Sequence, residues 1–581
     1  MNTIGYSWFW AHLIVIARMC LIFGPIRVGA GTHDGKTPSK AVSSRWARIV
    51  KGHTGVAAMQ IAVVSDKHAL ILDRVEHNPL KINGYPAWAS LYNLETNEVT
   101  PVHLKSNSFC AGGSFLGNGT LISFGGNPVA AARPSVGYYG PTNGLQSMRF
   151  YQPRDDGKAS LHEYNSIKLA SPRWYATATR LADGSIMIVG GSKVGAFRNN
   201  ANINNPTIEY FPPKYSPAGK PQIYMPFLER TLVSNLFPIV ITLPQPNLVF
   251  LAANRDAIVY NYKTHREFRL PRIPNRVRIT YPMTGGGILL PLSPQNGYKP
   301  EVMICGGTDL NDTLPTRLIK ASYPATTQCV RMAITKSGVK EGWKVEHMPQ
   351  GRIMPDLIMM PDGKILIVNG AQTGVAGYGS LRKMTGNSNA DNPSFTPVLY
   401  DPEAPPGKRF SSEGLPTTNI ARMYHSVGTL TPSGQVMLAG SNPNPDRSTA
   451  NYRTEYRVEW LSPPYIQDPD RPQILSLPKL ANYNDKFTVK LAETKLDLAK
   501  QNVKAILLDL GFVTHSTHMN SRLVELKTSI DPENKEVKVV MPPLPEIYPP
   551  GYGWLFVLVN GIPSAGKRIM VGSGELLLTK K

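Results

Sequence analysis

The sequence predicts an all-β protein in which a seven-bladed β-propeller precedes a small immunoglobulin-like sandwich. Three observations lead to this class: frequent helix breakers, a hairpin pattern with seven copies, and a change of pattern near residue 465. The 581 residues include 50 Gly and 51 Pro, which are spread too evenly for long helices. Hydrophobic and charged fractions of 42% and 18% are those of a globular protein, so extensive disorder is excluded.

Each copy of the hairpin pattern consists of an apolar strand, a polar turn and a second apolar strand that ends in small residues. The clear copies span 110–126, 174–191, 354–370 and 423–440, and the looser copies span 59–74, 239–254 and 283–307. The turns of the clear copies contain Gly119, Gly184, Gly363 and Gly434, as expected of tight hairpins. The copies end 52 to 70 residues apart, close to the kelch repeat of about 50 residues with loop insertions. We therefore expect a kelch-type β-propeller of four-stranded blades, with a repetitive β-sandwich as the structural alternative.

The repeat stops after "LSPPY", which ends at residue 465. From residue 466 onward, short alternating strands and turn residues predict an immunoglobulin-like sandwich. The predicted domains are therefore a propeller over 31–465 and a C-terminal domain over 466–581.

The first 30 residues predict a secretory signal peptide. An apolar stretch precedes Val28-Gly29-Ala30, which has the spacing of a cleavage site, so we expect cleavage after Ala30. An uncleaved membrane anchor is the alternative, but His12 and Arg18 interrupt the apolar run. Two N-glycosylation sequons, beginning at Asn118 and Asn311, agree with a secreted, extracellular protein without stable membrane insertion.

The chain carries a formal net charge of +22. The basic residues are scattered and no nucleic-acid-binding motif is present, so we expect a generally cationic surface and no nucleic-acid partner. Retention on anionic polysaccharide, and with it cell-wall association, is a further hypothesis from this charge.

The four cysteines lie at 20, 110, 305 and 329. Cys20 would leave with the signal peptide, and Cys305 and Cys329 are predicted to form a disulfide, with two buried thiols as the alternative. Cys110 is then left over, and an odd cysteine in a secreted protein requires an explanation.

Three positions at the start of hairpin copies carry side chains that suit a metal site. Cys110, Tyr175 and the pair Tyr424-His425 begin the second, third and seventh copies, so the inner strands of a propeller would bring them to one central channel. Imidazole and phenolate ligands suit Cu(II), whereas structural zinc prefers closed sulfur and nitrogen sets. A second imidazole could come from His515 or from His518, which would lie on opposite faces of a strand. Taken singly, each residue would be a buried thiol, a core aromatic or a hydrogen-bonded histidine.

Five segments together resemble the glyoxal oxidase and galactose oxidase family of copper radical oxidases, from about residue 45 to near the C-terminus. They are "SNSFCAGG", "SPRWYATATRLADGSIMIVGG", "ARMYHSVGTLTPSGQVMLAGSNP", "FVTHS" and "PPGYGWLFVLVNGIPSAGKRIMV". The segment "INNPTIEYFPP" is closer to the glyoxal oxidase branch. The resemblance implies a propeller of the glyoxal oxidase N-terminal type and a C-terminal domain of the galactose oxidase-like early-set type.

The resemblance also implies one copper ion and a thioether bond between Cys110 and Tyr175, which would carry a tyrosyl radical. Tyr175, His425 and His515 would be equatorial ligands, and Tyr424 would be the axial ligand that takes the substrate proton. Both side chains of the Tyr424-His425 pair must then reach the same metal. This requires an irregular backbone at the blade entrance, by which we mean the residues just before the inner strand of a blade.

One segment departs from the pattern of galactose oxidase, in which a Trp stacks over the modified tyrosine. Here the corresponding stretch is "GGSKVGAFRNN", with Lys193 at the nearest matching position. Phe197, the first aromatic residue after it, is expected to shield the ring of Tyr175.

The activity that the resemblance implies is oxidation of small aldehydes such as glyoxal and methylglyoxal to carboxylic acids, with reduction of O2 to H2O2. Extracellular peroxidases would be candidate users of the peroxide. The alternatives are a copper radical oxidase of primary alcohols or galactose, and a non-catalytic propeller that binds glycans or proteins.

Overall fold

Antiparallel β-strands make up most of the regular structure in the computed structural model, which describes residues 45–73, 75–128, 143–158, 160–214, 220–493, 496–531 and 536–575. The predicted signal peptide and Cys20 lie outside the described residues. Two short α-helices are described, α1 (Pro226–Arg230) and α2 (Lys336–Glu341). Among the residues that the structure describes, no helix is long and apolar enough to cross a membrane.

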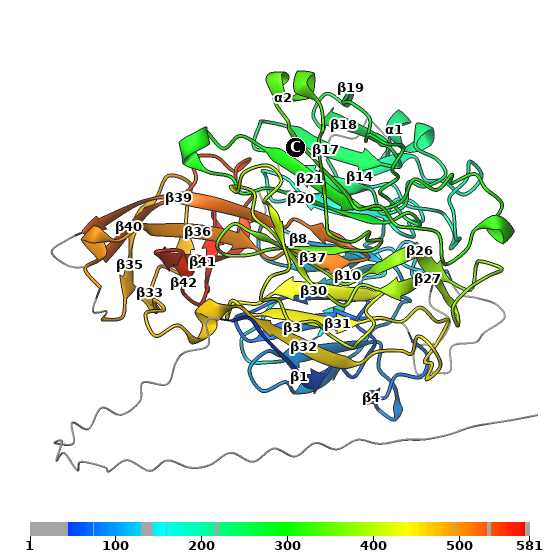
Figure 1. Ribbon diagram of the computed structural model, residues 1–581, viewed down its shortest axis with the longest axis horizontal. Helices are drawn as coiled ribbons and strands as arrows, with labels where there is room; N and C mark the ends of the chain where they lie inside the picture. Colours follow the sequence, from blue (N-terminus) through cyan, green and yellow to red (C-terminus); the bar gives the residue numbers. More distant parts are fainter. Residues whose placement is uncertain are drawn as a thin grey trace, which may run out of the picture. The chain divides into compact units, whose positions relative to one another are not determined.

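Five separate four-stranded sheets form the blades of a propeller-like arrangement (Figure 1). The blades are given in chain order, each from its inner strand outward. The first consists of β8 (Gly112–Phe115), β9 (Leu121–Phe124), β10 (Met148–Tyr151) and β11 (Leu161–His162). The second consists of β12 (Thr177–Arg180), β13 (Ile186–Val189), β14 (Thr207–Phe211) and β15 (Ile223–Tyr224). The next two are β16 (Ile239–Thr242), β17 (Leu248–Ala253), β18 (Asp256–Asn261), β19 (Arg266–Arg269) and β24 (Asp356–Met359), β25 (Ile365–Val368), β28 (Val398–Tyr400), β29 (Phe410–Ser411). The last is β30 (Ser426–Leu430), β31 (Val436–Gly440), β32 (Arg457–Ser462) and β1 (Ala47–His53).

A ten-stranded sheet contains two further four-stranded meanders, which a hairpin from the C-terminal part of the chain joins. One meander is β2 (Gln60–Val63), β3 (His68–Leu72), β6 (Ala89–Asn93), β7 (Val99–Val102) and the other is β20 (Gly285–Leu289), β21 (Glu301–Gly306), β22 (Gln328–Ala333), β23 (Lys344–His347). Between them lie β37 (Phe512–Thr514) and β38 (Thr517–Met519). The predicted disulfide is confirmed, because Cys305 of β21 bonds to its register partner Cys329 of β22.

The four clear hairpin copies are confirmed as the first two strands of four blades. Their turn glycines have positive φ, for example 80° at Gly184 and 87° at Gly434, as the short turns require. The copies at 354–370 and 423–440 end 70 residues apart, which is the longest spacing. The cause is the hairpin β26 (Ala371–Tyr378) and β27 (Ser388–Pro393), which is inserted between β25 and β28.

The C-terminal part forms a nine-stranded sheet (Figure 1). Its strands are β33 (Ile474–Ser476), β34 (Leu480–Ala481), β35 (Lys486–Leu491), β36 (Val503–Asp509), β39 (Arg522–Asp531), β40 (Glu536–Val540), β41 (Gly551–Val559), β42 (Ile562–Pro563) and β43 (Lys567–Val571). A single buried hydrophobic cluster includes Leu507 and Val557 from this sheet together with Phe250 of β17 and Ile304 of β21. The C-terminal sheet and the propeller therefore share one core.

Buried arginines fix two blade entrances to their blades. Arg173 donates from Nη1 to the carbonyl of Gly190 (2.7 Å) and pairs through Nε with Glu209 of β14 (2.6 Å). Arg422 makes the same two contacts in its own blade, with Gly440 (2.8 Å) and Glu459 of β32 (2.6 Å). Each arginine thus ties the segment before the inner strand to the second and third strands.

The carboxylate of Glu459 also ties the N-terminal strand to the last blade. Arg48 of β1 donates to it at 2.7 Å, and β1 pairs with β32 from Ala47 to His53. The N-terminal strand therefore completes the last blade, which the sequence pattern did not predict.

Replacing Glu459 with Gln should lower the free energy of unfolding by about 3–5 kcal/mol, because the fully buried carboxylate is the partner of two guanidinium groups. Glu95→Gln, which removes an exposed partner of Lys67, is the matched control and should cost less than about 1 kcal/mol. Urea unfolding followed by tryptophan fluorescence measures both. Equal small losses would show that the two ion pairs of Glu459 do not stabilise the last blade.

Candidate metal centre

The blade entrances depart from strand geometry in the same way at several positions. Cys110, Tyr175 and His425 lie one or two residues before an inner strand and have φ values of 58°, 61° and 64°. Side chains of a regular strand alternate between two faces. A left-handed residue interrupts this alternation, so that consecutive side chains can turn to the same side.

Two pairs of consecutive rings demonstrate the effect. The rings of Tyr424 and His425 have centroids 3.9 Å apart at an interplanar angle of 31°. The rings of Trp174 and Tyr175 stack with centroids 3.6 Å apart at 9°. The irregular backbone predicted for Tyr424-His425 is therefore confirmed, and the same geometry occurs at Tyr175.

His515 reaches the blades on the turn of the hairpin β37–β38. The strand β37 pairs with β2, where Thr514 lies opposite Gln60, and Thr517 of β38 pairs with Gly287 of β20. Both turn residues, His515 and Ser516, have positive φ (48° and 66°), the backbone of a type I′ turn that normally selects Asn and Gly. This turn places a C-terminal imidazole among residues from the blade entrances.

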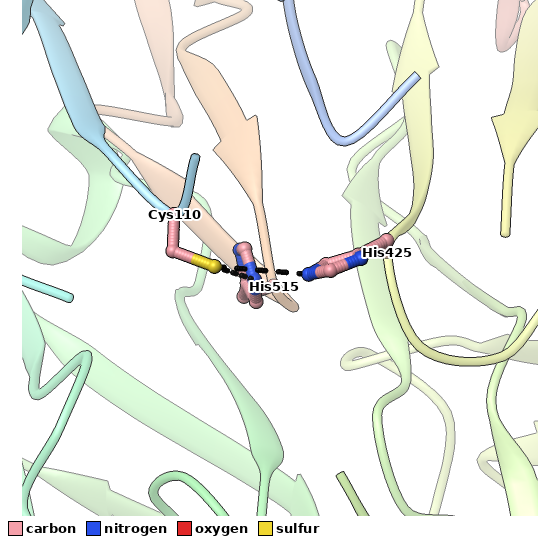
Figure 2. A group of neighbouring side chains, drawn as sticks. All are labelled: Cys110, His425 and His515. Atoms are coloured by element: carbon pink, nitrogen blue, oxygen red, sulfur yellow. Dashed lines mark hydrogen bonds between the residues drawn. The ribbon is translucent and has the colours of Figure 1, made fainter. Parts of the chain in front are cut away.

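Cys110, His425 and His515 converge from three separate segments (Figure 2). The Sγ atom of Cys110 lies 3.5 Å from Nε2 of His515 and 3.7 Å from Nε2 of His425. These three atoms lie within 4.8 Å of one another, and all three residues are buried. Such a cluster of soft and borderline donors is a candidate metal site.

Both imidazoles are held with Nε2 directed to the centre. Nδ1 of His425 donates to the carbonyl of Asn442 at 3.1 Å. Nδ1 of His515 donates to the hydroxyl of Thr514 at 2.6 Å, and that hydroxyl donates in turn to the carbonyl of Met59. Hydrogen bonds of this kind fix the tautomer and orientation of metal-binding histidines.

Burial keeps both imidazoles neutral, which is the form that binds metals. It lowers the pKa of His425 to about 3, against the opposing effect of the Asn442 carbonyl. Burial also lowers the pKa of His515 well below its ordinary value, and the neighbouring His425 adds to this.

Two phenols complete the donor set. The hydroxyl groups of Tyr175 and Tyr424 are in direct contact, and the Tyr424 ring lies 5.3 Å from that of His515. Burial, followed by the charge of Cys110 and a hydrogen bond to it, raises the pKa of Tyr424 well above its ordinary value. A metal cation would oppose this shift by favouring the phenolate.

Aromatic side chains that sequence reasoning did not single out surround Tyr175. Tyr281 contacts its ring edge-on at 4.5 Å, and Phe237 stacks with it at 4.7 Å. Phe237 also stacks with His515. These residues exclude water from the ring of Tyr175, and Phe237 has a left-handed backbone at its blade entrance like the site residues themselves.

The ring stacked most closely on Tyr175 is that of Trp174, which sequence reasoning also missed. Phe197, expected to shield Tyr175, is a partly buried residue packed against a separate cluster with Met283 and Leu310, and Lys193 is exposed. The physical reason is the left-handed backbone of Tyr175, which brings its immediate neighbour in the chain over its face. In a regular strand, neighbouring side chains point to opposite faces, so the sequence pattern did not indicate that Trp174 would stack on Tyr175.

His518 lies outside the cluster. It is part of β38, and its Nε2 lies 3.3 Å from Oδ1 of Asp356. Asp356 also accepts from Asn369 at 2.7 Å. Of the two candidate histidines, the structure therefore brings His515, and not His518, to Cys110 and His425.

The assembled donors are two imidazole nitrogens, two phenol oxygens and one sulfur. Nitrogen and oxygen ligands in a tetragonal arrangement suit Cu(II), whereas zinc would favour a closed tetrahedral set that includes the thiolate. A zinc site would use Cys110 Sγ as a ligand. In a copper site of nitrogen and oxygen ligands, Sγ would instead modify a neighbouring side chain.

Two family models match the chain. The model described as glyoxal oxidase N-terminus matches residues 73–465. The model described as galactose oxidase-like, early set domain matches residues 471–571. Together they extend over most of the propeller and the C-terminal sheet.

Curated relatives and a solved structure are similar over most of the chain. The aldehyde oxidase GLOX1 of Arabidopsis thaliana is 33% identical, covering 84% of this chain and 76% of the relative. The aldehyde oxidase GLOX of Vitis pseudoreticulata is 30% identical, covering 90% and 97%. A fungal alcohol oxidase of the AA5 family, solved in complex with copper, has the same fold with a TM-score of 0.67 and 17% identity, covering 91% of this chain and 99% of that chain.

His515→Gln should abolish stoichiometric binding of Cu(II), because it removes a donor from the centre of the cluster. His518→Gln is the matched control, since it alters a buried histidine of the same hairpin that contacts Asp356 instead. Metal analysis of both folded variants after copper loading and desalting measures the difference. Loss of copper from the His518 variant alone would contradict the assignment.

Proposed function

The chain belongs to the glyoxal oxidase family of copper radical oxidases, and we propose that it oxidises small aldehydes such as glyoxal and methylglyoxal to carboxylic acids with reduction of O2 to H2O2. The convergence of Cys110, Tyr175, Tyr424, His425 and His515 on one buried centre carries this proposal. Two of the relatives described above are named aldehyde oxidases, which supports the substrate class.

The residues present fit a copper ion. Nε2 of His425 and of His515, with the hydroxyl oxygens of Tyr175 and Tyr424, would hold it, and the hydrogen bonds at the two Nδ1 atoms preset both imidazoles. Copper bound there would supply one electron acceptor for a reaction that removes two electrons from the substrate.

The protein must supply the second acceptor, and Tyr175 is proposed for this role. A thioether bond from Cys110 to the ring of Tyr175 would lower the cost of removing an electron from that ring. Trp174, stacked at 3.6 Å, and the edge of Tyr281 would shield the oxidised ring from water.

Tyr424 is proposed as the general base, because it is the second phenol at the centre and lies beside Tyr175. The aldehyde would react as its hydrate, RCH(OH)2, which loses two protons and two electrons to give RCOOH. Dioxygen takes up the same two electrons and two protons as H2O2, so the cycle balances without a further reductant.

Three further assignments belong to this proposal. The two meanders of the ten-stranded sheet count as blades beside the five separate sheets, giving seven. Residues 1–30 direct the chain to secretion, and extracellular peroxidases would consume its peroxide.

Copper-loaded protein should produce H2O2 with glyoxal and methylglyoxal after oxidative activation, and Tyr424→Phe should lower kcat by about 10²-fold to 10⁴-fold, the usual contribution of a general base. Tyr378→Phe is the matched control, because its ring lies 6.2 Å from that of Tyr424 without an assigned role, and it should keep near wild-type kcat. A coupled peroxidase assay measures both.

The same assay with primary alcohols and galactose decides the substrate class. Peroxide from alcohols and none from aldehydes would replace the proposed substrate. Peroxide from no substrate would contradict the enzyme assignment.

Peptide mass spectrometry of the protein treated with copper in air should find the Cys110 and Tyr175 peptides covalently joined, with the loss of two hydrogens, which O2 takes up as H2O2. Cys110→Ser should yield separate peptides and peroxide production near background. Separate, unmodified peptides from active wild-type protein would contradict the thioether.

A further inference from the structure

Four arginines lie beside one blade edge, and none of them belongs to the candidate metal centre. Arg255 lies in the turn between β17 and β18, and Arg272, Arg276 and Arg278 lie in the segment between β19 and β20. Backbone hydrogen bonds from Ile273 to the carbonyl of Arg255 (2.9 Å) and from Ile279 to that of Asn254 (3.1 Å) hold the segment against the turn. We call these four residues the arginine cluster.

The arginine cluster lies on the side of the blades that carries the metal centre. The strand β16 pairs with β17 so that Ile239 faces Ala252. Arg255 is therefore at the same end of its blade as Phe237, which stacks on Tyr175. Tyr281, which contacts Tyr175 edge-on, follows Arg278 by three residues.

Three carboxylates near the arginine cluster, Asp256, Asp309 and Asp312, leave its four guanidinium groups with an excess of one positive charge. Asp256 contacts Arg272 at 2.8 Å but also lies 3.9 Å from Arg230. The buried Asp312 contacts Arg278 at 2.9 Å and accepts a hydrogen bond from Asn254. Asp309, the other nearby carboxylate, accepts a hydrogen bond from Tyr323 at 3.2 Å.

Two members of the arginine cluster, Arg255 and Arg276, make no ion pair among the residues that the structure describes. Nε of Arg255 is buried without a hydrogen-bond partner there. Burial lowers the pKa of Arg255, and the positive charges of Arg278, Arg272 and Arg276 lower it further. Asp256 opposes this effect only in part, and a bound anion would offset the three positive charges that act on Arg255.

The backbone presents Arg276 to solvent at a conformational cost. Asn275 and Arg276 are consecutive left-handed residues, with φ values of 56° and 62°. Asn275 anchors the turn by donating to the side chain of Gln328 at 2.7 Å. Such residues cost on the order of 1–3 kcal/mol each and concentrate at functional sites. Arg272, with 70% of its side chain exposed, lies on the same segment.

We propose that the arginine cluster binds a carboxylated polysaccharide along the face that bears the metal centre. Guanidinium groups bind carboxylates in bidentate geometry. Several exposed or half-buried guanidinium groups along one edge suit a polymer with repeated carboxylates better than a single small anion. The choice of a glycan over a nucleic acid rests on the proposed secretion. The binding itself does not depend on the proposed oxidase activity.

The test is affinity electrophoresis of the full chain without copper, in native gels that contain polygalacturonate, with dextran gels as the neutral reference. The double variant Arg272→Gln/Arg276→Gln should bind about tenfold more weakly, which corresponds to about 0.7 kcal/mol per exposed charge. Binding by the wild-type protein should weaken as salt is added.

The matched control is Lys500→Gln/Lys538→Gln, which removes the same charge from two exposed residues of the C-terminal part. Its affinity should stay within about twofold of wild type, because surface charges beyond a Debye length of about 10 Å contribute little. Equal weakening of both variants would show that net charge alone acts, and no retardation in polygalacturonate would overturn the site. Tighter binding to a DNA duplex than to polygalacturonate would replace the glycan with a nucleic acid.

Discussion

The candidate metal centre depends on left-handed backbone at the blade entrances. Each blade begins with a residue that must leave strand geometry before its inner strand begins, and at Cys110, Tyr175 and His425 this turns a functional side chain to the common centre. Non-glycine residues in this conformation are strained, so the surrounding fold must hold them. Rings that neighbour one another in the chain then become neighbours in space, as Trp174 and Tyr175 do.

The fold supports this strain from two directions. Arg173 and Arg422 tie the entrance segments of Tyr175 and of the Tyr424-His425 pair to later strands of the same blades. From the other side, the hairpin β37–β38 adds to β2 and carries His515. A propeller-like arrangement and a C-terminal sheet that share one core can therefore bring side chains from four segments of the chain to one buried centre.

The repeat pattern predicted much of this arrangement. Equivalent positions of the hairpin copies identified Cys110, Tyr175 and Tyr424-His425, because blades of one kind begin at one end of the propeller. Closure of the last blade by β1 was not predictable, since strand pairing between Arg48 and Leu461 leaves no local pattern. The family resemblance, and not the repeat pattern, selected His515 over His518, because the side chain of His515 is placed by an atypical turn. The stacking of Trp174 depended on a single φ angle. These features follow from tertiary contacts and not from periodicity.

We propose that the sulfur of Cys110 modifies Tyr175 while nitrogen and oxygen atoms hold the metal. The Sγ atom lies 3.5 Å from Nε2 of His515, close enough that sequence and fold alone permit thiolate ligation as a rival chemistry. A crystal structure of the copper-loaded protein, with anomalous diffraction at the copper edge, separates the two. We expect copper bound by Nε2 of His425 and His515 and by the oxygens of Tyr175 and Tyr424, with Sγ bonded to the Tyr175 ring. Copper bound directly to Sγ, with an unmodified Tyr175, would contradict it.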